Sequence, residues 1–157
     1  MIKIQSASIL LACVLSGCTA TGSSSISNAN QQLAKSESPY RFVKTEQSES
    51  HTAYELQPAG EKHPSIAFSS DELTADVFKS IKEKCNFQKS DLVETRAVSY
   101  QPPSFYEVWV FNDPISESQN KQSAVSVLLY QYPNMGGVDI SLSANCHHKP
   151  SKLIFGK

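Results

Sequence analysis

Three adjacent residues near the end of the chain, Cys146, His147 and His148, have the side chains best suited to chemistry. A thiolate followed by two imidazoles offers ligands for zinc or copper, a nucleophile with its base, or one half of a disulfide. Neighbouring side chains on an extended chain point to opposite sides, so His147 and His148 rarely bind one ion together. We expect both histidines to be solvated residues that follow a strand and precede Pro150, with a metal site as the alternative.

The other candidate side chains form no catalytic pattern. His51 and His63 lie in polar stretches, and we interpret them as loop residues. Glu107 lies in the apolar run FYEVWVF, residues 105–111. It is either a buried, paired acid or a rim carboxylate that discourages edge pairing of a strand, and we expect the second. The sequence has no phosphate-binding glycine loop, nucleophile elbow or HExxH motif, so we expect no catalytic residue and no cofactor.

The first eighteen residues, MIKIQSASILLACVLSGC, have the pattern of a secretory signal. Lys3 gives a short positive start, and the apolar segment 9–15 is shorter than the about 20 residues that span a bilayer. The last four residues, LSGC at 15–18, resemble the lipobox of bacterial lipoproteins. This resemblance implies cleavage before Cys18 and diacylglycerol on its thiol. An ordinary signal peptide, with Cys18 in a disulfide, is the alternative.

Acylation of Cys18 implies a protein that is held on a membrane surface with its folded part in water, because two or three acyl chains anchor stably. Thr19 differs from the Asp that retains lipoproteins of this class on the inner membrane. The resemblance therefore implies the outer membrane, on its periplasmic face. Cys13 is interpreted as a passive apolar part of the cleaved peptide, residues 1–17.

Residues 19–39 are rich in Ser, Asn, Gln, Ala and Thr and have almost no large apolar side chain. This composition predicts a disordered tether over residues 18–39, which spans roughly 25 Å for about 20 flexible residues. Residues 40–157 have the length of one small domain. Cleavage of residues 1–17 would remove Lys3, one of the 14 basic side chains, so the 15 acidic side chains outnumber the basic ones in the mature protein. There is no basic patch with interleaved aromatic residues, so nucleic acid is not an expected partner.

The segment SSDELTADVFKSIKEKCNF, residues 69–87, predicts a helix over about 70–85. Ser69 and Glu72 fit a capping box at its start, and Asn86 suits its end. One apolar stripe recurs along it at four-residue steps: Leu73, Val77, Ile81 and Cys85. We interpret this stripe as facing the core, and a groove-binding helix for a partner is the alternative.

After the helix the period of apolar residues changes to two, which is typical of strands. Four runs have this pattern: residues 92–100, 105–111, 123–132 and 138–146. Two upstream segments, PYRFVKTE and TAYELQ, are further candidates. Because the connections are short and rich in turn residues, neighbouring strands are expected to be antiparallel. The sequence predicts an α+β fold, with an antiparallel sheet of four to six strands and one helix packed on one face.

The same phase argument predicts a disulfide between Cys85 and Cys146. Cys85 ends the apolar stripe of the helix, and Cys146 ends the apolar row that begins at Val138. If these two faces pack together, both thiols point into one layer. If Cys13 is removed with the signal peptide and Cys18 is acylated, Cys85 and Cys146 are the remaining pair of thiols in an oxidising compartment. Such a bridge, closing a loop of about 60 residues, is expected to stabilise the domain by roughly 4 kcal/mol.

These features favour a non-catalytic envelope lipoprotein whose domain binds a protein or cell-wall partner. Aromatic residues are favoured in interface cores, although the domain core is the alternative place for them. The candidate contact residues are Phe105, Tyr106, Trp109, Tyr130 and Tyr132. A metal-handling lipoprotein that uses His147 and His148, with His51 or His63, is the second hypothesis. An anchored hydrolase with Glu107 in a deep cleft is the third.

Overall fold

The computed structural model describes residues 22–156, so the signal segment and Cys18 lie outside the described residues. In chain order the elements are α1 (Gly22–Lys35), β1 (Tyr40–Gln47), β2 (His51–Pro58), β3 (Glu61–Lys62), the 3₁₀ helix η1 (Ile66–Ser69), α2 (Asp71–Cys85), the 3₁₀ helix η2 (Lys89–Asp91), β4 (Leu92–Gln101), β5 (Ser104–Asn112), β6 (Gln122–Gln131), β7 (Val138–Ser143) and β8 (Lys152–Gly156). The prediction of an α+β fold with antiparallel strands is confirmed.

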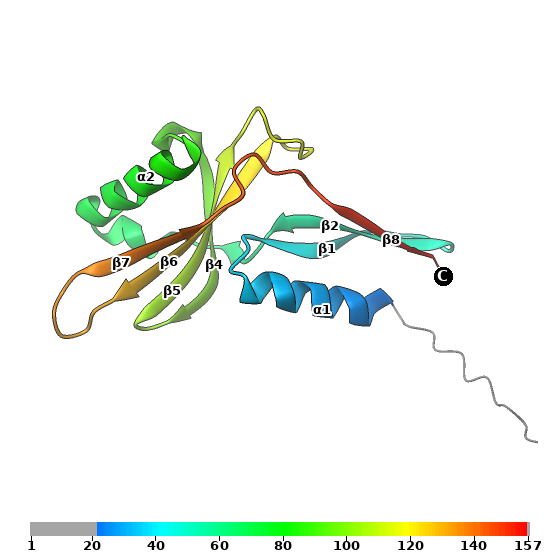
Figure 1. The fold of residues 1–157 in the computed structure, drawn as a ribbon, viewed down its shortest axis with the longest axis horizontal. Coiled ribbons are helices and arrows are strands. Elements are labelled where there is room, and N and C mark those ends of the chain that lie inside the picture. Colours follow the sequence, from blue (N-terminus) through cyan, green and yellow to red (C-terminus); the bar gives the residue numbers. More distant parts are fainter. Residues whose placement is uncertain (1–21, 157) are drawn as a thin grey trace, which may run out of the picture.

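The described strands form two sheets rather than the single sheet that was predicted (Figure 1). One has five strands in the order β3-β4-β5-β6-β7, and the other has three in the order β1-β2-β8. We call the five-stranded sheet with α2 the large half, and the three-stranded sheet with α1 the small half. Among the described residues, no helix is both long and apolar enough to cross a bilayer.

The large half carries most of the core, between α2 and one face of its sheet. The alternation of β5 places Phe105, Trp109 and Phe111 on this face, where they pack with Val77 and Ile81 of α2. The predicted stripe is therefore a core stripe, and burial of each such side chain contributes about 1.5–3 kcal/mol. The four predicted strands correspond to β4, β5, β6 and β7, of which β7 ends earlier, at Ser143.

The ends of α2 follow from local side-chain chemistry. Ser70 is extended, and its hydroxyl accepts a hydrogen bond from the Leu73 backbone at 3.3 Å, so Ser70 is the N-cap. The predicted capping box from Ser69 to Glu72 is wrong by one residue, because Ser69 is the last residue of η1. Asn86 adopts a left-handed φ of 59° and ends the helix as predicted.

The predicted tether over residues 18–39 is wrong for Gly22–Lys35, which form α1. The folded part thus begins well before Tyr40. Ile26 is buried, and the Asn30 side chain bonds to both backbone groups of Phe42, donating to its carbonyl at 3.0 Å and accepting from its N–H at 2.7 Å. The Asn30 amide thereby occupies the outer edge of β1, as a neighbouring strand would. Composition alone does not reveal such a tertiary contact.

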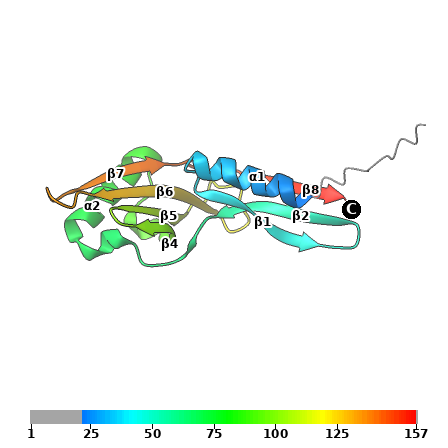
Figure 2. The same cartoon turned by 90° about the horizontal axis from the view of Figure 1, so that it is seen from below.

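The last strand, β8, brings the end of the described chain back to the small half. It pairs with β2, so that Ala53 lies opposite Ile154 and Tyr54 opposite Leu153. The start of α1 and the end of β8 consequently lie at the same end of an elongated molecule, in both views (Figures 1 and 2). The turns that join β4 to β5 and β6 to β7 lie at the opposite end.

We expect Asn30→Ala to lower the free energy of unfolding by about 1–2 kcal/mol, because two backbone groups of Phe42 lose their partner. Urea denaturation followed by circular dichroism measures the change. Asn28→Ala is the matched control, since Asn28 is exposed on the same helix and its loss is expected to stay within about 0.5 kcal/mol. Equal losses in the two variants would contradict this role of Asn30.

Candidate functional site

The predicted disulfide between Cys85 and Cys146 is present. The two Cα atoms are 5.3 Å apart and the residues are 61 positions apart in the sequence. The bridge joins the end of α2 to the segment after β7, as the phase argument requires. Because both sulfurs are used in this bond, Cys146 is neither a thiolate nucleophile nor a metal ligand.

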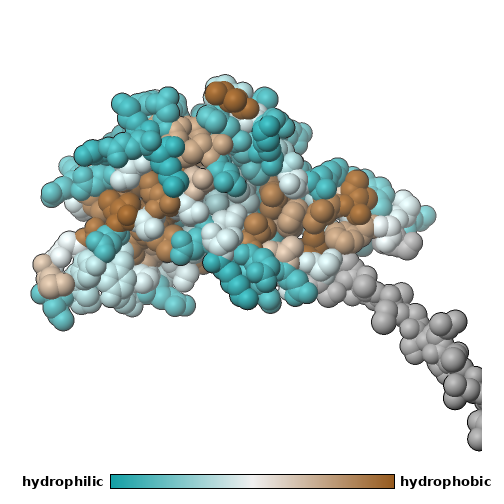
Figure 3. Space-filling view, viewed as in Figure 1, coloured by the Kyte–Doolittle hydropathy of each residue, from teal (hydrophilic) through white to brown (hydrophobic). Residues whose placement is uncertain are grey.

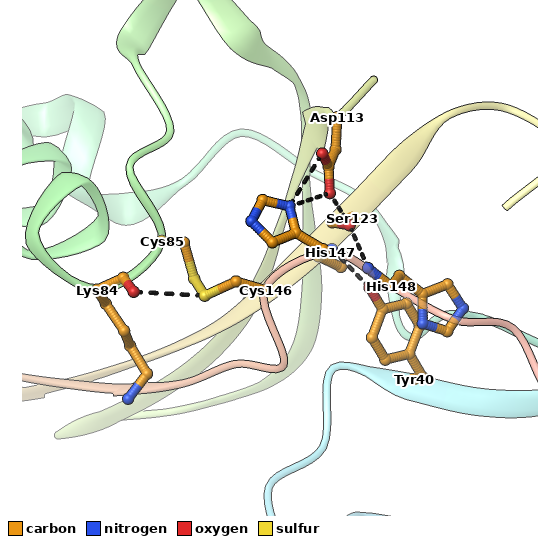
Figure 4. Close-up of a disulfide and its surroundings, with 9 residues drawn as sticks. Tyr40, Lys84, Cys85, Asp113, Ser123, Cys146, His147 and His148 are labelled. Carbon is orange, nitrogen blue, oxygen red and sulfur yellow. Dashed lines mark hydrogen bonds and ion pairs between the residues drawn. A yellow bond between two sulfur atoms is a disulfide. The ribbon is translucent and has the colours of Figure 1, made fainter. Parts of the chain in front are cut away.

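His147 turns away from the bridge and meets a buried carboxylate (Figure 4). It has a left-handed φ of 65°, and its Nδ1 atom lies 3.1 and 3.2 Å from the two oxygens of Asp113. The Ser123 hydroxyl donates to Asp113 Oδ2 at 2.6 Å. Burial alone would raise the pKa of Asp113, but hydrogen bonds from Ser123, His147 and the Ile115 backbone outweigh it and lower this pKa.

Asp113, Ser123 and His147 are the residue types of a hydrolase triad, yet their hydrogen bonds run in a different order. In a triad the serine hydroxyl donates to the imidazole. Here the Ser123 hydroxyl donates to the carboxylate and accepts from the His148 backbone N–H at 2.7 Å. Ser123 is also 1 % exposed, so a substrate does not reach it. This arrangement fixes the chain after Cys146 and does not activate a nucleophile.

His148 is buried, and the prediction that it is solvated is wrong. The left-handed turn at His147 directs the next side chain inward, where its ring stacks on Tyr40 with centroids 3.8 Å apart. Burial lowers the pKa of His148, against smaller opposite effects of the Leu56 backbone and Glu55. Its Nε2 atom has no hydrogen-bond partner among the described residues.

The stack of His148 on Tyr40 lies where the two halves meet. Tyr40 begins β1 in the small half, and its hydroxyl accepts from the Ala124 backbone of β6 at 2.7 Å. Burial raises the pKa of Tyr40 to about 12. The two imidazoles therefore have different partners, and within residues 22–156 no group of three or more His, Cys, Asp or Glu residues is arranged to bind a metal.

Glu107 is fully buried on the central strand β5, so the expected rim or edge position is wrong. Its Oε1 atom accepts from the Ile66 backbone at 2.8 Å and from the Tyr100 hydroxyl at 2.6 Å. Its Oε2 atom accepts from Trp109 Nε1 at 2.8 Å. Burial and the bond to Glu107 together raise the pKa of Tyr100, which keeps this phenol a donor. All three donors to Glu107 belong to the large half and to η1, and Glu107 lines neither of the two hollows described below.

The predicted contact residues divide between the two faces of the five-stranded sheet. Phe105 and Trp109 lie in the core beneath α2 and cannot contact a partner. Tyr106 and Tyr130 point to the other face, where Tyr130 is 42 % exposed. Tyr132 lies beyond β6, forms an edge-on ring contact with Tyr130 and donates to Asp139 at 2.5 Å.

We call the uncovered part of this second face the open face. Its side chains form two rows across β4, β5, β6 and β7: Ser99, Tyr106, Leu128 and Ser141, then Gln101, Ser104, Tyr130 and Asp139. They line a shallow hollow of about 430 Å³ near the turns of the large half. Figure 2 shows this side of the sheet, with α2 behind it and α1 beside it. The sequence alone did not single out the polar residues of these rows, although they alternate along their strands with core residues.

The small half covers the remainder of the second face. Tyr40 and Ala59 pack against Val108 and Val110 of β5. The Tyr106 hydroxyl donates to the Ser38 carbonyl at 2.9 Å, so the segment between α1 and β1 borders the open face. Tyrosine rings beside hydroxyl, amide and carboxylate groups can contact a partner through both apolar and hydrogen-bonding surface. The open face is the candidate functional site.

We expect Glu107→Gln to lower the free energy of unfolding by about 1–3 kcal/mol. The amide N–H₂ that replaces one carboxylate oxygen then faces a hydrogen-bond donor and cannot accept from it. Denaturation followed by the fluorescence of Trp109, the only tryptophan, measures this loss. Glu83→Gln at an exposed position of α2 is the control with the same chemical change. A loss no larger than that of the control would show that the carboxylate is dispensable.

The buried His148 predicts a loss of stability in mild acid. The unfolded chain binds a proton on this histidine near its ordinary pKa of 6.5, whereas the folded chain keeps it neutral to lower pH. The free energy of unfolding is therefore expected to fall as pH drops below about 6.5, by up to about 1.4 kcal/mol per pH unit. The lowered pKa of Asp113 acts in a separate window, below 3.8.

Urea denaturation at several pH values between 7.5 and 4.5 measures this slope. His148→Gln is expected to flatten it, and His63→Gln, at an exposed position, is expected to preserve it. If the two variants retain the same slope, His148 is not the group that titrates.

No known family, curated protein or solved structure matches this chain. Its function is therefore inferred from the geometry of its own residues.

Proposed function

We propose that this chain is a non-catalytic envelope lipoprotein, acylated at Cys18 and anchored in the outer membrane on the periplasmic face. Its domain binds a protein or cell-wall component through the open face. The support for the anchor is the resemblance of residues 15–18 to a lipobox. The observation that carries the binding role is the open face itself, which exposes tyrosine rings at the end of the molecule opposite the start of α1.

The distance between anchor and domain is set by the short chain between them. Three residues separate Cys18 from Gly22, and such a segment extends at most about 14 Å. The small half would then lie close to the bilayer, and the open face would lie away from it. This orientation leaves the open face accessible to a partner in the periplasm.

The chemistry of the open face favours an uncharged partner surface. Its rows contain a single charged side chain, Asp139, and no basic one. Tyr132 already donates to that carboxylate, and this hydrogen bond raises the pKa of Tyr132. Tyr130 and Leu128 supply apolar area, while Gln101 and the serines supply donors and acceptors. Both a glycan and a neutral protein surface fit these groups.

The two alternative functions receive less support from the geometry. A metal site on His147 and His148 would need both imidazoles on one ion, but they contact Asp113 and Tyr40 respectively. A hydrolase that uses Glu107 would need this carboxylate in a cleft, and it is fully buried.

A photo-reactive phenylalanine analogue at position 130, in the full-length chain in a bacterial host, tests the open face. We expect crosslinks to one defined partner from position 130 and none from position 54, a tyrosine of the small half that serves as the matched control. Retention on isolated cell-wall sacculi distinguishes a glycan partner from a protein. Tyr130→Ser is expected to weaken either interaction roughly tenfold. Unchanged binding by this variant would overturn the role of the open face.

The acylation of Cys18 is tested separately from the binding role of the open face. The mature protein is expected to begin at an acylated Cys18 by mass analysis, and Cys18→Ser is expected to move the protein from the membrane to the soluble fraction. A wild-type protein that is recovered unacylated would refute the anchor and leave the binding result unaffected.

A further inference from the structure

A second hollow lies on the α2 side of the large half, on the face opposite the open face. It has a volume of about 490 Å³ and lies between the first turns of α2 and the strands β5, β6 and β7. Its apolar lining comes from η1, α2 and these strands: Ile66, Leu73, Phe105, Leu129 and Val138. In Figure 3 apolar surface, in brown, is visible between the hydrophilic outer side of α2 and the strands below it. We call this hollow the helix groove.

One side of the helix groove is acidic. Glu72 and Asp76 line it, are exposed, and stand four residues apart on α2, so their side chains are neighbours. Like charges at this spacing destabilise a helix. Neither carboxylate has an ion-pair partner among the described residues, and the groove lining includes no Lys, Arg or His. The groove thus combines an apolar floor with unneutralised negative charge.

The opposite side of the helix groove is formed by the β6–β7 connection. Gly137 and Val138 line the groove there, and Gly136 and Gly137 have φ values of 67° and 93°, which favour glycine. A Cβ atom at either glycine would have no neighbour within 4 Å, so the space beside these two residues is open. Met135, in the same connection, is 82 % exposed. This side is therefore open to a ligand longer than the groove.

We propose that the helix groove binds a cationic, amphipathic peptide segment of a partner protein. One Lys or Arg side chain of the segment lies between Glu72 and Asp76, and an adjacent aliphatic side chain packs on Leu73 and Val138, the partly exposed apolar residues of the lining. The volume falls within the range of about 300–1,000 Å³ that is usual for ligand sites. The paired carboxylates repel phosphate groups, which excludes anionic lipid headgroups and nucleic acid as occupants. This proposal is independent of the open face, because the side chains that carry the two sites point to opposite faces of the sheet.

Titration of the full chain with two synthetic peptides tests this proposal: acetyl-Leu-Lys-Leu-Lys-amide and its counterpart with Glu in place of Lys. We expect the Lys peptide to bind and to shift the NMR signals of Leu73 and Val138, and the Glu peptide not to bind. The double variant Glu72→Gln, Asp76→Asn is expected to raise the Kd of the Lys peptide about 3- to 10-fold, because it removes two exposed charge pairs. Higher salt is expected to weaken binding to the wild type more than to this variant.

The matched control is Glu49→Gln, Glu83→Gln, which removes the same charge from exposed positions outside the groove. Its Kd is expected to equal that of the wild type. Val138→Ser, at the rim, is expected to weaken binding, and circular dichroism checks that this variant is folded. The proposal is overturned if the Lys peptide does not bind at millimolar concentration, if the Glu peptide binds equally well, or if both double variants behave alike. Any of these results leaves the crosslinks from position 130 unaffected.

Discussion

The core of the large half depends on a carboxylate that needs hydrogen-bond donors. A buried acid without partners costs several kcal/mol, so Glu107 is tolerated only because three donors converge on it. One of them, the Ile66 backbone, belongs to η1, which leads directly into α2. The acid thereby fixes the start of α2 over the sheet, and the Cys85–Cys146 bridge fixes its end. With both ends held, the apolar stripe between them packs in one register.

The junction between the two halves has a different chemistry. Here Tyr40 reaches across to the Ala124 backbone, and His148 stacks on its ring. The chain arrives at His148 through the left-handed residue His147, whose ring contacts Asp113, and Ser123 accepts from the backbone N–H of His148. The segment that resembled a reactive site is thus a structural corner. It lies next to the disulfide because the bridge ends the apolar row of β7 and the chain must then cross to the small half.

Much of the large half could be predicted from the sequence because its elements have periodic patterns. The four-residue stripe identified α2, and alternation identified β4 to β7 and even the pairing of Cys85 with Cys146. α1 was missed because its stability comes from Ile26 and from the Asn30 contact with β1, not from its polar composition. β8 was missed because it is short and gains its partner, β2, from a distant part of the chain. Glu107 and His148 were misplaced because burial of a polar side chain depends on partners that only the fold supplies.

The arrangement of the halves also determines how the molecule would respond to a pulling force. A load applied between the start of α1 or the end of β8, in the small half, and the turns of the large half must pass through their junction. The disulfide lies within the large half and does not bridge this boundary. The tension is therefore carried by the connecting backbone segments and by the non-covalent contacts across the junction, among them those of Tyr40, Ala59 and Tyr106. The halves would separate there while the cross-linked core around α2 stays intact.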